Sequence, residues 1–138
     1  MIIRKIDNKY IIKLLDINID IEDYYDQEKI SNLFKNIILK IKEKDNISGL
    51  LDIEAYVNKY YGTIIEIEKI YPYLDEIDMH IHFHIDTPFL MELNGNDIKK
   101  QQEVYYYDNK FYTNYNKLSD SNIIYKTEEI LEKGIKVI

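Results

Sequence analysis

The residues best suited to chemistry are the three histidines of the chain, His80, His82 and His84, which alternate within the stretch IDMHIHFHI. In a β-strand, residues two positions apart point to the same side and lie about 6–7 Å apart. Imidazoles at this spacing can bind one zinc, nickel or iron ion when a neighbouring strand supplies a further ligand. Glu66 has the matching polar position on the preceding predicted strand. One hypothesis is therefore a metal site formed by these four residues.

The same pattern is also typical of an ordinary antiparallel sheet with one face in water. Met79, Ile81 and Phe83 would then fill the core, and the histidines would pair with glutamates across strands for about 0.2–1 kcal/mol each. This interpretation requires no cofactor. A third alternative is a histidine face that responds to pH or contacts a partner.

A second acidic stretch, from Asp16 to Glu22, has the oxygen spacing that begins a calcium-binding loop. However, such a loop needs glycine at its sixth position and glutamate at its twelfth, where this chain has Ile21 and Gln27. The alternating isoleucines favour an edge strand or an acidic surface loop instead. An edge strand over residues 17–22 could support a homodimer by strand addition.

Tyrosine is the third candidate, because the chain contains 14 tyrosines and many fall in predicted turns and hairpins. Tyrosine combines a large contact area, few rotatable bonds and a polar tip, and it is enriched where proteins bind one another. The predicted partner-binding residues are Tyr105, Tyr107, Tyr112 and Tyr115.

Composition excludes several classes of function. The net charge is −7 and Arg4 is the single arginine, which argues against nucleic acid as a partner. The chain has no cysteine, so disulfides and thiolate chemistry are excluded. It also lacks a phosphate-binding glycine loop, a nucleophile elbow and a stretch of about 20 apolar residues for a membrane span. We expect a cytoplasmic protein that does not contact membranes, and the missing catalytic motifs favour a non-enzyme over an enzyme.

A helix is predicted from Gln27 to Glu43, because its apolar residues recur at intervals of three and four. Asp-Asn pairs at 7–8 and 108–109 predict two tight hairpin turns. Alternating segments predict strands over 2–6, 9–15, 50–57, 62–70 and 77–85. The last third is predicted to form a hairpin over 103–115, a short strand at 123–125, a short helix over 128–133 capped by Thr127, and a final strand.

These elements predict one α+β domain over residues 1–138. We expect an antiparallel sheet with one main amphipathic helix packed on one face. The order of the core is β-β-α-β-β-β, and the C-terminal hairpin and short helix follow it.

The segment from Ile3 to Glu68 resembles the N-terminal domain of MecA-type adaptors of Clp proteases. The likeness rests on an opening strand pair, the acidic motif Asp20-Ile21-Glu22-Asp23 before an amphipathic helix, and two strands after it. It covers about half of the chain, and the helix is shorter than in that family. The resemblance implies an adaptor that binds substrates for a protease.

Three functions follow from these observations. The first is a non-enzymatic module that binds another protein, which the missing catalytic motifs and the tyrosine-rich hairpin favour. The second is a metal-binding protein or metal-dependent enzyme that uses the histidine strand, and the third is the adaptor function implied by the resemblance.

Overall fold

A computed structural model describes residues 2–15, 26–71, 76–94, 103–117 and 122–137. The chain divides into two compact units, residues 1–85 and 86–138, and each unit has its own sheet. Strands and helices are mixed without regular alternation, which confirms the predicted α+β class. The candidate sites discussed below lie in the first unit.

The first unit contains a five-stranded sheet in the order β1-β2-β4-β3-β5. Its strands are β1 (Ile2–Ile6), β2 (Lys9–Leu15), β3 (Gly49–Asn58), β4 (Gly62–Tyr71) and β5 (Ile77–His84). Asp7 takes a φ of 53° in the turn between β1 and β2, a conformation that aspartate and asparagine tolerate better than most residues. The predicted first hairpin and its boundaries are therefore confirmed.

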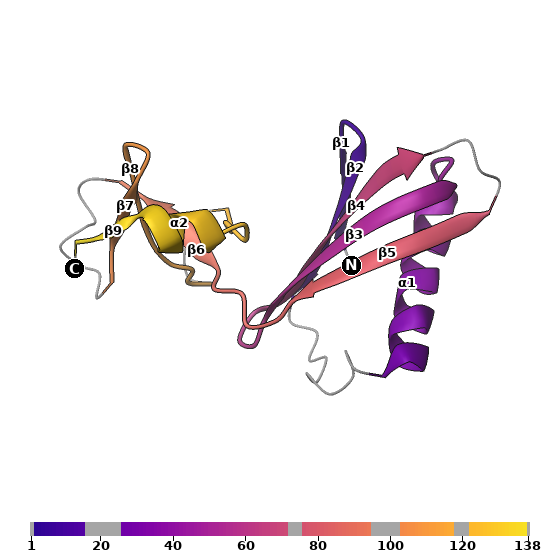
Figure 1. The fold of residues 1–138 in the computed structure, drawn as a ribbon, viewed down its shortest axis with the longest axis horizontal. Helices are drawn as coiled ribbons and strands as arrows, with labels where there is room; N and C mark the ends of the chain where they lie inside the picture. Colours follow the sequence, from indigo (N-terminus) through magenta and orange to yellow (C-terminus); the bar gives the residue numbers. More distant parts are fainter. Residues whose placement is uncertain (1, 16–25, 72–75, 95–102, 118–121, 138) are drawn as a thin grey trace. The chain divides into compact units, whose positions relative to one another are not determined.

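Helix α1 (Gln27–Lys42) covers one face of this sheet, as Figure 1 shows. The helix starts where the Asp26 side chain accepts hydrogen bonds from the backbone N–H groups of Glu28 and Lys29. Phe34 and Ile37 are almost completely buried against alternate residues of β2, β3 and β4. One amphipathic helix on one sheet face confirms the central part of the fold prediction.

The position of β5 differs from the expected all-antiparallel sheet, because β5 pairs with β3 and runs parallel to it. The cause lies in β4, whose two edges are already occupied by β2 and β3. The next strand cannot pair with β4 and instead pairs with the free edge of β3. Since β5 runs opposite to β4 and β4 runs opposite to β3, β5 and β3 are parallel.

The second unit contains a four-stranded sheet in the order β6-β8-β7-β9 and the short helix α2 (Glu128–Lys133). Its strands are β6 (Leu90–Leu93), β7 (Tyr105–Tyr107), β8 (Lys110–Asn114) and β9 (Ile135–Lys136). Asp108 and Asn109 both have positive φ, which confirms the second predicted turn. Thr127 precedes α2 but donates its hydroxyl to the Pro88 carbonyl instead of capping the helix. No helix in the described ranges is long and apolar enough to cross a membrane.

Candidate metal centre

The candidate site lies on the face of the first sheet that α1 leaves uncovered. Alternation places Asp52 and Glu54 of β3 on this face, because Leu51, Ile53 and Ala55 are completely buried beneath α1. The histidines of β5 occupy the alternate positions that point to this same face. The parallel pairing sets His80 opposite Asp52 and His82 opposite Glu54.

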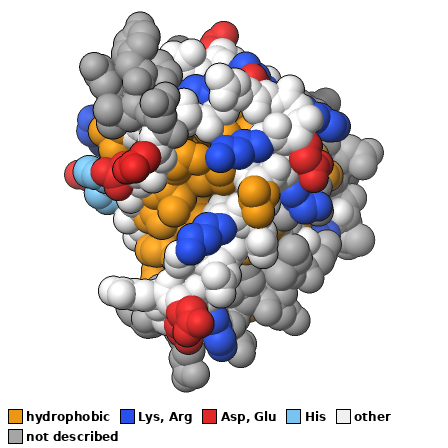
Figure 2. Space-filling model, turned by 90° about the vertical axis from the view of Figure 1, so that its right-hand side faces the viewer, with side chains coloured by type: hydrophobic (Ala, Val, Ile, Leu, Met, Phe, Trp, Pro, Cys, Tyr) orange, Lys and Arg blue, Asp and Glu red, His pale blue; other side chains and the backbone are white. Residues whose placement is uncertain are grey.

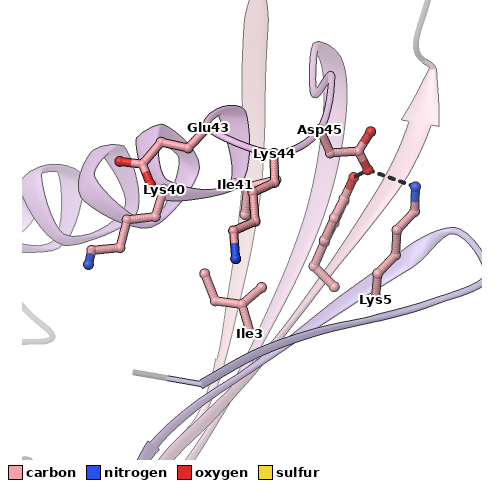
Figure 3. Close-up of a pocket in the computed structure, with 8 residues that line it drawn as sticks. Ile3, Lys5, Lys40, Ile41, Glu43, Lys44 and Asp45 are labelled. Carbon is pink, nitrogen blue, oxygen red and sulfur yellow. Dashed lines mark hydrogen bonds and ion pairs between the residues drawn. The ribbon is translucent and has the colours of Figure 1, made fainter.

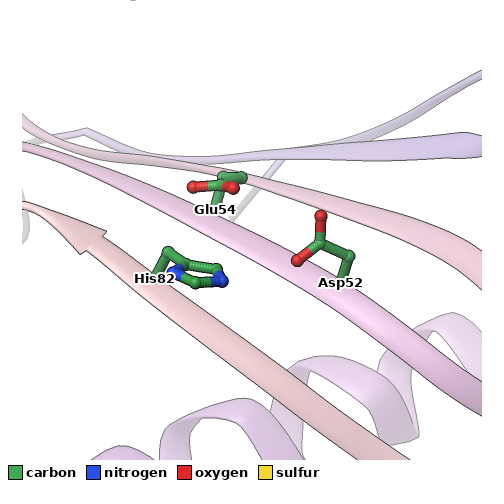
Figure 4. Close-up of side chains that lie close together, drawn as sticks. All are labelled: Asp52, Glu54 and His82. Carbon is green, nitrogen blue, oxygen red and sulfur yellow. The ribbon is translucent and has the colours of Figure 1, made fainter.

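Three side chains converge at this position. The ligand atoms of Asp52, Glu54 and His82 all lie within 4.8 Å of one another. Figure 4 shows the imidazole of His82 extending toward the carboxylate of Asp52, with Glu54 beside them on the same strand as Asp52. Two carboxylate oxygens and one imidazole nitrogen form a mixed ligand set of the kind that binds first-row divalent metal ions.

A neighbouring histidine orients one of the carboxylates. His84 Nε2 lies 2.5 Å from Glu54 Oε2, a short hydrogen bond in which the imidazole N–H donates to the carboxylate. The His84 ring also stacks on Tyr56, with the ring centroids 4.5 Å apart and the planes 7° apart. These two contacts restrain His84 and, through it, Glu54, in the way that outer partners orient metal ligands.

Two pairs of carboxylates lie opposite one another beside the site. Glu54 lies directly opposite Glu66 across β3 and β4, and Asp52 lies directly opposite Glu68. Like charges directly opposite one another destabilise a sheet. Lys9 approaches Glu68 only to 4.0 Å. A cation bound at Asp52 and Glu54 would reduce the repulsion within these carboxylate pairs.

The predicted metal ligands are partly brought together. His82 belongs to the cluster, and His84 contacts it through Glu54. His80 stands apart, with a side chain that is 64% exposed and 4.0 Å from Asp78. Glu66 is buried opposite Glu54, one strand further from the histidines. Asp52 was not among the predicted ligands, because its contact with His82 depends on the pairing of β5 with β3.

The tyrosines proposed to bind a partner contribute to the packing of the second unit. Tyr112 is buried with Leu90 and Ile130, and Tyr105 and Tyr107 pack against this cluster. Tyr107 hydrogen-bonds Glu129, which raises the pKa of the Tyr107 hydroxyl. Their role in binding a partner, and that of Tyr115, stays a prediction. The calcium-like stretch and the edge strand over 17–22 lie outside the described residues.

The fold and the site together define a class: an α+β unit whose open sheet face carries a carboxylate–histidine cluster. No family model matches the chain, and no curated protein or solved structure matches it significantly. The adaptor function implied by the resemblance stays a prediction.

Proposed function

We propose that the first unit is a binding module for a divalent transition-metal ion, with Asp52, Glu54 and His82 as its protein ligands. The observation that carries this proposal is the convergence of their three ligand atoms within 4.8 Å. Three protein ligands leave coordination positions for water or a substrate. The imidazole favours zinc, iron or nickel over magnesium and calcium, which prefer oxygen ligands alone. A cytoplasmic location, supported by the absence of cysteine, completes the proposal.

The test is titration of tag-free protein with Zn²⁺, Mn²⁺ and Mg²⁺ by isothermal calorimetry, with native mass spectrometry to count bound ions. We expect one Zn²⁺ per chain and weaker binding of Mg²⁺. His82→Ala should weaken Zn²⁺ binding by about 10–100-fold or more, because even outer partners of metal ligands contribute that much. His80→Ala is the matched control, since it removes an imidazole from the same face outside the cluster. Equal losses in both variants would refute the proposal.

A second candidate function, binding of another protein chain, is favoured by the exposed edge of β5. Among the described strands, β5 is the edge of its sheet, and it contains no lysine, arginine, proline or glycine to block pairing. Strand β1, the opposite edge, carries Arg4 and Lys5. Figure 2 shows hydrophobic side chains gathered on the side of the first unit where α1 lies. The partly buried apolar residues of α1 and β5 are Leu33, Ile77, Met79, Ile81 and Phe83.

We propose a second copy of the chain as the occupant of this edge. When two β5 strands pair antiparallel about a twofold axis perpendicular to the sheet, each residue lies opposite one that points to the same face. Even-numbered residues therefore pair with even-numbered residues. In the registers centred on His80 or Ile81, Asp78 of one copy lies opposite His82 or His84 of the other, where a carboxylate can accept a hydrogen bond from an imidazole N–H. Because the chain lacks cysteine, Ile81→Cys and His80→Cys can each be tested for a disulfide-linked dimer, with Arg4→Cys on β1 as the control. Monomeric mass by light scattering at every concentration would contradict this candidate.

A further inference from the structure

A groove open to solvent lies on the helix side of the first sheet, between β1 and the C-terminal end of α1. Its volume is about 590 Å³, which is within the range of small-molecule sites. It is lined by Ile3, Lys5, Tyr10, Lys40, Ile41, Glu43, Lys44 and Asp45. Asp52, Glu54 and His82 lie on the opposite face of the sheet, so the groove is independent of the candidate metal centre.

One end of the groove is closed by polar groups that hydrogen-bond one another. The Asp45 carboxylate accepts hydrogen bonds from Lys5 Nζ at 2.7 Å, from the Tyr10 hydroxyl and from the backbone N–H of Asn46 at 2.8 Å. These donors hold the pKa of Asp45 well below its usual range. Lys5 and Lys69 also lie near the Tyr10 ring, 5.7 and 5.4 Å from its centroid. The negative charge of Asp45 is therefore already neutralised.

The other end presents two cations. Lys40 and Lys44 are four residues apart, so they project from the same side of the chain at the end of α1. Within the described part of the chain, neither ammonium group makes a hydrogen bond or an ion pair. In Figure 3 the Lys44 ammonium group points down toward Ile3, whereas the Lys40 side chain extends to the left below the helix and the Glu43 carboxylate is drawn above it.

The floor between these ends is apolar. Ile41 and Tyr10 are 3% exposed, and Ile3 is partly buried against the same core. The groove thus has an apolar floor and two cations at one end. At the other end, the charge of the Asp45 carboxylate is neutralised by its hydrogen-bond donors. This combination is complementary to a molecule that has one anionic group and a short apolar body. The anionic group can accept charge-assisted hydrogen bonds from the lysines, and contact with the floor removes the apolar body from water.

We propose that this groove binds a small amphiphilic anion, such as a short acyl carboxylate, with its head group at Lys40 and Lys44 and its apolar body against Ile3 and Ile41. A polyanion such as nucleic acid is disfavoured, because the whole chain carries a charge of −7 and repels a long negative ligand. A small anion responds mainly to the nearby lysines, since salt screens the more distant charges.

The probe is octanoate below its micelle concentration, titrated into the full chain and followed through the methyl NMR signals of the isoleucines. We expect saturable binding of one octanoate per chain, with the largest shifts at Ile3 and Ile41. Acetate, which lacks the apolar body, and octanol, which lacks the charge, should each bind at least about tenfold more weakly.

The double variant Lys40→Gln/Lys44→Gln should weaken octanoate binding by about tenfold or more. The matched control is Lys35→Gln/Lys42→Gln, which removes two charges from exposed positions of α1 outside the groove and should change affinity less than twofold. Equal weakening in both double variants, octanol binding as tight as octanoate, or no saturable binding of octanoate would each overturn the proposal. Asp52→Asn should leave octanoate binding unchanged, which separates this test from that of the metal site.

Discussion

Replacing Asp52 with asparagine should change the stability of the first unit in opposite directions with and without metal. Asparagine keeps the size of the side chain but removes one negative charge from a position opposite Glu68 and within 4.8 Å of Glu54. At that distance two like charges repel by about 0.9 kcal/mol in water and by about 3.5 kcal/mol at an effective dielectric constant of 20. Because both side chains are only partly buried, we expect metal-free Asp52→Asn to be more stable by about 1 kcal/mol.

Excess metal should make the wild-type protein more stable than Asp52→Asn. An ion present at 100 times its dissociation constant stabilises the folded state by about 2.7 kcal/mol. If the loss of one ligand weakens binding about 100-fold, the same concentration stabilises the variant by only about 0.4 kcal/mol. In a unit of this size, 1 kcal/mol corresponds to about 4–8 °C in melting temperature.

The assay is thermal unfolding followed by circular dichroism at 222 nm, in a chelator and in excess Zn²⁺. The 16-residue helix α1 belongs to the first unit, and its signal makes this wavelength report mainly on that unit. Asp78→Asn is the control, because it makes the same change on the same sheet face outside the cluster. A metal-free Asp52→Asn protein that is less stable than wild type, together with an unchanged shift on adding Zn²⁺, would refute the reasoning.

Three further predictions concern the first unit. Burial and the hydrogen bond to Asp45 raise the pKa of Tyr10 above its ordinary value of 10.0, so the stability that Tyr10 contributes is present below pH 10 and lost above it. The stability difference between wild type and Tyr10→Phe, measured by urea unfolding, should therefore shrink above pH 10; a constant difference would contradict this. Phe34→Ala should cost about 3–5 kcal/mol in the same assay, because Phe34 is 1% exposed. Gly62→Ala should cost at least about 1–3 kcal/mol, since Gly62 has a φ of 111° and a new Cβ would lie 2.3 Å from the Leu14 carbonyl oxygen. A melting temperature within 2 °C of wild type for either alanine variant would contradict its prediction.

The local elements could be predicted because their signals are local. The period of two marked the strands, the three-and-four spacing marked α1, and the Asp-Asn pairs marked both tight turns. Strand β6 was missed, because the four residues LMEL show little alternation and bury three apolar side chains. Fully buried short strands lack the polar positions that make a pattern visible.

The candidate site could be predicted only in part, because parity determines the face on which a side chain lies but not the strand beside it. Within each strand, alternation places His82, Asp52, Glu54 and Glu66 on the polar side. The choice between Asp52 and Glu66 as ligand depends on strand order, which is a long-range property of the chain. Sequence spacing contains no signal for the fact that β4 is paired on both edges.

Strand order thus determines which chemistry this face offers. Had β5 paired with β4, the histidines would have met Glu66 and Glu68, and Asp52 would have been on the far side of β4. Pairing with β3 sets His82 opposite Glu54 and within reach of Asp52. A shift of one residue in this pairing would turn all three histidines into the core and expose Met79, Ile81 and Phe83. Burial of the apolar side chains of β5 therefore selects the register that also brings His82 to Asp52 and Glu54. The packing of α1 on the sheet and the geometry of the candidate metal centre thus depend on the same strand pairing.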